Sequence, residues 1–139
     1  MVYLDSSVLV AALVEDEPSH EAALGLLRRK KPAAWTHALT ETFATLTGGR
    51  LGVRVSPQVA GRLIASLTPK LRLVELTAQD ISVAIAAAEA AGARGGVIYD
   101  YLHLVAARKS AVTVLYTLNV RHFAALARSG DPEIHEPPA

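Results

Sequence analysis

The chain has 139 residues, of which 51% are hydrophobic and 19% charged, and its formal net charge is +1. This length and composition suit one compact domain with a sizeable core, so we expect a single domain over residues 1–139. The absence of cysteine excludes disulfides, thiolate metal sites and cysteine nucleophiles, and the near-neutral charge argues against nucleic-acid binding through bulk positive charge.

The sequence shows neither a targeting segment nor a membrane span. No basic segment precedes an apolar one at the N-terminus, and no apolar run approaches the roughly 18 residues that a transmembrane helix needs. We therefore expect a cytoplasmic protein with no membrane partner.

The first half of the chain begins with a short apolar strand at residues 2–4 and continues mainly as helices. Asp5 or Ser6 can cap the first of these helices, since both residue types are favoured at that position. The four helices predicted in this half cover residues 6–14, 17–29, 36–49 and 56–68.

The helix at residues 36–49 follows directly on the segment "PAAW", for which we predict no strand. Its apolar spacing predicts a buried face formed by Leu39, Phe43 and Leu46. On this pattern Glu41 points away from the core.

The second half of the chain alternates strands and helices. Residues 71–76 alternate apolar and charged side chains, which predicts a strand, and Thr77 with Asp80 resembles a capping box for the helix that follows. We predict helices over residues 77–92, 97–110 and 120–130, a strand over 112–117 and an edge strand over 133–136.

Strands that are separated by helices favour right-handed crossovers and a parallel sheet with helices on both faces. Ligands of such sheets bind outside the carboxyl ends of the strands. Asp5 follows the first predicted strand and Asn119 follows the strand at 112–117, so two polar side chains are expected at one edge of the sheet.

Each polar candidate also has an ordinary structural interpretation when it is taken alone. Asp5 can be an N-cap, Glu41 a solvated helix residue, and Asp100 a favourable charge at a helix N-terminus. We expect His103, one turn after Asp100, to pack or to form hydrogen bonds rather than to bind a ligand.

Four segments change this interpretation when they are taken in order: "LDSSVLV", "TETFATL", "YDYLHLVAA" and "LYTLNVRHF". Together they resemble the PIN-domain nucleases, and most closely the VapC-type toxins of bacterial toxin–antitoxin pairs. The resemblance covers essentially the whole chain. It implies an α/β fold, a PIN-like three-layer sandwich whose central, mostly parallel sheet of four to five strands is flanked by helices.

The resemblance also implies a set of site residues. Asp5, Glu41 and Asp100 match the acidic metal-binding positions of the family, with Asp5 and Asp100 as metal ligands and Glu41 acting through water or on the attacking water. Asn119 stands where the family often has a fourth acid, and it completes the predicted catalytic set. The flanking hydroxyl positions of the family match Ser6 and Thr117.

Binding of a divalent cation would explain why several acids are placed together. Phosphodiester hydrolysis needs an activated water, a neutralised phosphate and a stabilised leaving oxygen, and a hard cation can supply all three. Mg²⁺ is typically held by one or two carboxylates together with waters, so a sparse acidic edge suits it, and Mn²⁺ is expected to substitute. Three carboxylates crowded together would repel one another, and a bound cation would relieve that repulsion.

The implied activity is that of a metal-dependent endoribonuclease acting on single-stranded or structured RNA. The implied partners are a VapB-type antitoxin that inhibits the enzyme and a second copy in a homodimer. We expect Trp35 and Tyr99 to pack in the core or in a dimer rather than against a base. The candidates for contacts with RNA phosphates are Arg50, Arg54, Arg94, Arg121 and His122.

Two other functions were weighed against this one. A phosphatase with an aspartyl nucleophile would need a second aspartate two residues after Asp5, where this chain has Ser7. A PIN-like binding module that has lost catalysis would not need to keep Asp5, Glu41 and Asp100. The binding module is the remaining alternative.

Overall fold

The computed structural model describes residues 1–29, 31–49, 52 and 54–139. Five strands form within these residues: β1 (Val2–Leu4), β2 (Ala33–Trp35), β3 (Arg72–Val74), β4 (Val114–Tyr116) and β5 (Glu133–His135). The helices are α1 (Ser6–Leu13), α2 (His20–Arg28), α3 (His37–Gly48), α4 (Pro57–Leu67), the 3₁₀ turn η1 (Thr68–Lys70), α5 (Ala78–Ala91), α6 (Val97–Lys109) and α7 (Val120–Leu126).

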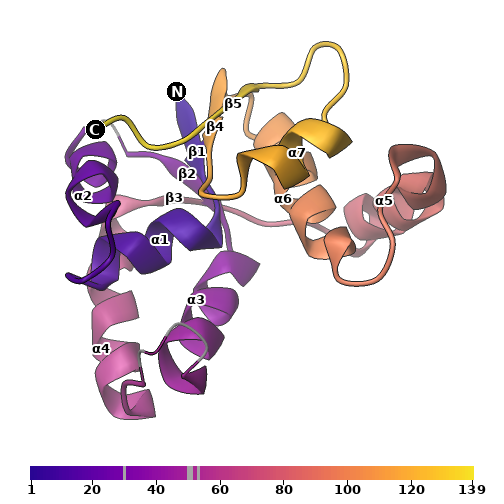
Figure 1. Cartoon of the computed structure of the whole chain (residues 1–139). Coiled ribbons are helices and arrows are strands. Elements are labelled where there is room, and N and C mark those ends of the chain that lie inside the picture. Colours follow the sequence, from indigo (N-terminus) through magenta and orange to yellow (C-terminus); the bar gives the residue numbers. More distant parts are fainter. Residues whose placement is uncertain (30, 50–51, 53) are drawn as a thin grey trace.

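The five strands form one sheet in the order β3-β2-β1-β4-β5, and every pairing is parallel. In the centre of the sheet, Leu4 of β1 lies opposite Tyr116 of β4. This register brings the residues that follow β1 and β4 to the same edge. Because all five strands are parallel, the carboxyl end of the sheet gathers the segments that open α1, α3 and α7 (Figure 1).

Helices cover both faces of the sheet (Figure 1). Successive strand residues point to opposite faces, so Tyr3 packs with side chains of α5, α6 and α7, while Leu4 packs with those of α1 and α2. The side chains of Ala33 and Ala34 divide in the same way between the two cores. The architecture is therefore a three-layer α/β sandwich with a parallel sheet, as the sequence predicted.

Most predicted elements are confirmed, with shifts at their ends. Asp5 caps α1 and accepts a hydrogen bond from the Val8 amide, and Thr77 with Asp80 forms the capping box of α5. The helix predicted over 17–29 begins only at His20, and the edge strand predicted over 133–136 is β5. No helix in the described residues is both long and apolar enough for a membrane crossing.

In the middle of the chain, one prediction was wrong and another was only partly correct. The segment "PAAW" contains a strand, β2, whose three residues are all buried, and three residues are too few to show a periodic pattern. In α3 the buried side chains are Ala38, Thr42 and Leu46, whereas Phe43 is 37% exposed. Leu46 is thus buried and Leu39 partly buried as predicted, but Ala38 and Thr42 share the buried face and Phe43 does not.

An ion pair fastens the end of α6 to the turn before β5. Arg108 donates from Nε and Nη2 to the two oxygens of Asp131 at 2.6 and 2.9 Å, and its guanidinium lies 5.6 Å from the ring centre of Tyr101. The Arg128 amide also donates to Asp131. Burial alone would raise the pKa of Asp131, but these hydrogen bonds hold that pKa below its usual value.

We expect Asp131→Asn to lower the free energy of unfolding by about 1–3 kcal/mol at neutral pH, because it leaves a partly buried guanidinium without its charged partner. A lowered pKa in the folded state means that the unfolded chain binds a proton first on acidification. The difference from wild type should therefore be full above about pH 4 and should shrink as the pH falls below it. Urea unfolding across this range, with exposed Asp16→Asn as the control, measures it; a difference that does not change with pH would contradict the assignment.

Candidate active site

The carboxylate of Asp5 is the most buried acid at the carboxyl edge of the sheet, with 3% of its surface exposed. Its Oδ1 accepts hydrogen bonds from Ser7 Oγ at 2.5 Å and from the Val8 amide at 3.3 Å. Its Oδ2 accepts one from Thr117 Oγ1 at 2.7 Å. Three donors therefore compensate for the removal of this carboxylate from water.

The same hydroxyls tie the segments after β1 and β4 together. Ser7 Oγ accepts a hydrogen bond from the Leu118 amide at 2.9 Å, and Thr117 Oγ1 accepts one from the Asn119 amide at 2.9 Å. Each hydroxyl thus donates to Asp5 and accepts from the segment that follows β4. The position of Asp5 is consequently set by two strands that lie far apart in the sequence.

A buried histidine joins β1, α3 and α6. His103 is 1% exposed; its Nδ1 lies 2.7 Å from Tyr3 Oη, and its Nε2 lies 2.6 Å from Glu41 Oε1. Tyr3 Oη also accepts a hydrogen bond from the Trp35 amide at 3.2 Å. A continuous chain of hydrogen bonds therefore runs from the backbone of β2 to the carboxylate of Glu41.

The direction of this chain follows from its donors. Burial raises the pKa of Tyr3 well above its usual value, so the phenol keeps its proton. Because this phenol accepts from the Trp35 amide, its own proton is donated to Nδ1 of His103. With Nδ1 accepting, Nε2 carries a proton and donates it to Glu41. Each link of this series of hydrogen bonds therefore has one donor and one acceptor.

Asp100 lies in the first turn of α6, half-buried, with 28% of its side chain exposed. Its Oδ2 is 3.8 Å from His122 Nδ1, near the start of α7. Burial raises the pKa of Asp100, and the nearby charge of Asp5 raises it further. The two carboxylates therefore lie within electrostatic reach of each other.

The three acids differ in how their surroundings act on them. Burial raises the pKa of Asp5 despite the hydrogen bonds from Ser7 and Thr117. Burial also acts on Glu41, but the hydrogen bond from His103 outweighs it and the pKa of Glu41 is lowered. Asp5 and Asp100 are thus the acids that a cation would relieve, while Glu41 is already compensated by protein groups.

The donor set fits a hard cation held by few protein ligands. Among the residues that the structure describes, no three His, Asp or Glu side chains are grouped closely enough to hold a metal ion. Glu41 is hydrogen-bonded to His103, but its charge still raises the pKa of Asp100, so it lies within electrostatic reach of that acid. Mg²⁺ commonly binds one or two carboxylates and keeps several waters, which matches Asp5 and Asp100 at an open edge.

Of the other predicted site residues, Thr117 and Asn119 lie at the edge beside Asp5, whereas Ser6 does not contact Asp5. Thr117 contacts Asp5 as expected, but the serine that does so is Ser7 and not Ser6. Asn119 is exposed, and its backbone N–H donates a hydrogen bond to Thr117 Oγ1, which holds the residue at the edge of the sheet.

The basic residues predicted to contact RNA phosphates also differ in how close they lie to the acids. His122 approaches Asp100, and Arg121 is exposed beside it on α7. The Arg54 guanidinium lies against Gly49, eight residues and thus roughly 12 Å of helix beyond Glu41, so it lies outside the acidic edge. Arg94 is exposed in the turn before α6, and Arg50 lies outside the described residues.

Ser7 and Tyr3 were not identified from sequence as contributors to the site, whereas His103 forms hydrogen bonds as expected and only its partners were not predicted. His103 stands one helical turn after Asp100, which was the available signal that both face the same side of α6. Ser7 was considered only as the place where a second aspartate is missing. Tyr3 looks like an ordinary strand residue, and only its partners show that its hydroxyl matters.

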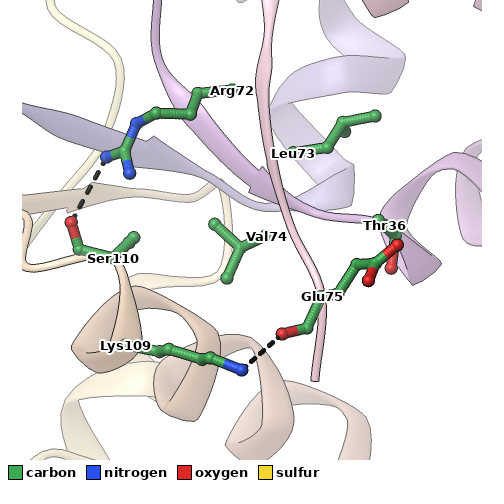
Figure 2. Close-up of a pocket in the computed structure, with 7 residues that line it drawn as sticks. All are labelled: Thr36, Arg72, Leu73, Val74, Glu75, Lys109 and Ser110. Carbon is green, nitrogen blue, oxygen red and sulfur yellow. Dashed lines mark hydrogen bonds between the residues drawn. The ribbon is translucent and has the colours of Figure 1, made fainter. Parts of the chain in front are cut away.

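A separate hollow opens at the edge of the sheet beside β3 (Figure 2). In it, Lys109 Nζ donates to the carbonyl of Glu75 at 2.8 Å, and Arg72 donates to the carbonyl of Ser110 at 3.2 Å. The hollow contains none of the three acids described above, and its basic groups bond to the backbone. It is not part of the candidate site.

The fold and sequence are similar to those of known proteins. A family model described as PIN domain matches residues 2–129. Over 105 residues the chain is 30% identical to Ribonuclease VapC27 of Mycobacterium tuberculosis, an alignment that covers 75% of this chain and 74% of that protein.

Solved structures share the fold at low identity. The VapC20 toxin of M. tuberculosis, described as cleaving the sarcin-ricin loop, matches with a TM-score of 0.72 and 20% identity over 95% of this chain and all of that one. VapBC2 of Rickettsia felis, bound to a DNA fragment from its promoter, matches with a TM-score of 0.67 and 16% identity over 98% of both chains. VapBC-1 of nontypeable Haemophilus influenzae matches with a TM-score of 0.62 and 19% identity over 98% of both chains.

We expect Thr117→Val to lower the free energy of unfolding by about 1–3 kcal/mol, because the buried Asp5 carboxylate and the Asn119 amide each lose a partner. Urea unfolding measures the change. Thr113→Val removes the hydroxyl of an exposed threonine near β4 and serves as the matched control. Equal stabilities for the two variants would contradict the role of Thr117.

We expect His103→Leu to raise the pKa of Glu41, because the variant removes the Nε2 donor that stabilises the ionised carboxylate. Titration of the glutamate side-chain carbons by NMR measures this directly. Glu133 is exposed and far from His103 in the fold, so its titration in the same spectra is the internal control. An unchanged Glu41 titration in a folded variant would refute the hydrogen-bond chain.

Proposed function

The chain belongs to the PIN domain family and, within it, to the VapC ribonucleases, and from this premise we propose that it is a metal-dependent endoribonuclease toxin. The proposed reaction is hydrolysis of phosphodiester bonds in single-stranded or structured RNA. The observation that supports it best is the approach of Asp100 to the buried Asp5 at the carboxyl edge of the sheet, where the charge of Asp5 raises the pKa of Asp100. Perturbed acids at such an edge are a feature of functional sites.

Asp5 and Asp100 are the proposed metal ligands. A bound Mg²⁺, or Mn²⁺ in its place, would supply the activation of water and the neutralisation of phosphate charge. Asp5 is held rigidly by Ser7, Thr117 and the helix it caps, so its remaining lone pairs have a fixed direction. Asp100 is more exposed, so a cation held there would keep waters that oxygen atoms of the substrate could replace.

Glu41 is the proposed acceptor that orients the attacking water. His103 holds its Oε1, and the lowered pKa keeps the carboxylate ionised at neutral pH. An ionised carboxylate beside the metal ligands can accept a hydrogen bond or a proton from water. The hydrogen bond to His103 fixes the direction in which it does so.

Polar groups of the α7 region complete the proposed site. Asn119 can orient water through its amide without adding charge. Arg121 and His122 are exposed on the same helix, and His122 approaches Asp100, so both can contact the phosphates that flank the cleaved bond.

The proposed partners are an antitoxin of the VapB type, which would inhibit the enzyme, and a second copy of this chain. Similarity to two VapBC structures supports the antitoxin. The dimer is an expectation from the family resemblance.

A local acidic edge on a protein of net charge +1 also fits an enzyme that selects RNA by shape at one groove rather than by overall charge.

We expect the purified, partner-free protein to cut total cellular RNA into discrete fragments when Mg²⁺ or Mn²⁺ is present. Asp5→Asn and Asp100→Asn should each lower the cleavage rate by about 100-fold or more, since loss of a ligand should cost at least as much as loss of an outer partner. Sequencing of the fragment ends identifies the target.

Two controls separate catalysis from folding. Asp16→Asn removes an exposed carboxylate far from the site and should cleave like wild type. Thermal melting with and without metal should show stabilisation of the wild type that both site variants lose, because a ligand selective for the native state raises its stability. Fragments that are the same for wild type and variants would leave the non-catalytic binding module as the function.

A further inference from the structure

Three aromatic rings form a stack that runs from the core to the surface beside the acids. The rings of Trp35 and His37 lie 4.6 Å apart at an angle of 28°, and those of His37 and Tyr99 lie 5.5 Å apart at 9°. Trp35 is 5% exposed, whereas Tyr99 is 48% exposed. One face of Tyr99 is thus occupied by His37, and the exposed part of its ring continues the stack outward.

The stack is anchored firmly at its inner end. Trp35 closes β2, and its ring also makes an edge contact with His103 at 5.2 Å and 90°. His37 opens α3 directly after β2. Trp35 belongs to the fully buried β2, and His37 follows it at the start of α3, so the ring of Tyr99 stacks on a partner that is anchored to the core.

Both outer members of the stack lie beside acids of the candidate site. His37 Nδ1 is 3.6 Å from Oε1 of Glu41, one turn further along α3. Tyr99 immediately precedes Asp100 in the first turn of α6. A planar group stacked on Tyr99 would therefore lie next to the position where the proposed function places the cleaved phosphate.

We propose that Tyr99, supported by His37 and Trp35, is a binding site for one nucleobase of the RNA strand next to the cleaved phosphodiester; this rests on the proposed ribonuclease function and names its substrate contact. Single-stranded RNA is commonly bound by stacking its bases on aromatic side chains, which tolerates different sequences because every base has a π face. A rigid ring loses little conformational freedom on binding, so the contact can hold the strand in register with the acids.

The position of Tyr99 favours a base over an apolar protein segment. The side chain that follows it is the half-buried Asp100, and the residues before α6 are the exposed Arg94, Gly95 and Gly96. Beside them, Val97 is 39% exposed at the start of α6, so the surface around Tyr99 combines one apolar side chain with charged and glycine residues. It suits a nucleotide, whose flat base needs one ring and whose phosphate needs charged groups.

The test measures RNA binding without cleavage. A fluorescently labelled single-stranded RNA of mixed sequence is titrated with protein in the presence of EDTA, so that no hydrolysis intervenes. Tyr99→Ala should weaken binding by about 5- to 100-fold, the loss that corresponds to one stacked base. Tyr99→Phe and Tyr99→Trp keep an aromatic face and should bind like wild type. Ile85→Ala, an exposed apolar residue on α5, is the matched control and should also bind like wild type.

An abasic strand with the same backbone separates stacking from structural damage. Wild type and Tyr99→Ala should bind the abasic strand equally, because neither can stack on it. If Tyr99→Ala binds base-bearing RNA as tightly as wild type, or loses the same factor on the abasic strand, the proposal is wrong. A change in sedimentation mass instead of RNA affinity would assign Tyr99 to a protein interface and would likewise overturn it.

The same experiment separates this proposal from the proposed function. Normal RNA binding by Tyr99→Ala, together with metal-dependent cleavage by wild type, would remove the base site and keep the ribonuclease. Binding that depends on Tyr99 in a protein that never cleaves RNA would keep the base site and remove the catalytic assignment.

Discussion

The buried carboxylate of Asp5 is the group around which the carboxyl edge of the sheet is built. An ionised group at 3% exposure is costly unless several donors meet it, and here a helix N-terminus and two hydroxyls do so. Those hydroxyls also accept from the segment after β4, so the carboxylate can be buried only when β1 and β4 are in register. The charge that the site uses is thus coupled to the assembly of the central strands.

A second network of hydrogen bonds crosses the core beside β1. Tyr3 and His103 occupy positions that an ordinary sandwich would fill with apolar side chains, and both are almost completely buried. Their hydrogen bonds end at Glu41, so the packing of α6 on the sheet also sets the direction of a carboxylate on α3. A buried network of hydrogen bonds is costly when it is only partly satisfied. This network therefore favours the observed arrangement of β1, α3 and α6 over other arrangements.

The two networks divide the acids into different chemical roles. Burial raises the pKa of both Asp5 and Asp100, the charge of Asp5 raises that of Asp100 further, and a cation would reverse these effects. Glu41 is drawn toward the ionised form by His103. In the proposed function, carboxylates therefore serve as metal ligands in one surrounding and as a water acceptor in another.

Local sequence patterns correctly predicted much of the secondary structure. The alternation of strands and helices predicted a parallel sheet, and the cap at Asp5 and the capping box at Thr77 follow from residues within one turn of each other. Local patterns failed for β2, which is short, and in part for α3, where they placed Leu46 correctly but buried Phe43, which is exposed. Glu41 was accordingly placed in solvent, although its partner His103 lies 62 residues further along the chain.

The sequence by itself determined the class of fold, the helix starts and the order of the acidic residues, because these depend on neighbours in the chain. Only the tertiary structure decided which hydroxyl holds Asp5, which histidine holds Glu41 and which aromatic ring stands exposed beside Asp100. Each of these depends on atoms brought together by strand register and helix packing. Contacts between residues so far apart in the chain leave no periodic trace in the sequence, so spacing alone cannot reveal them.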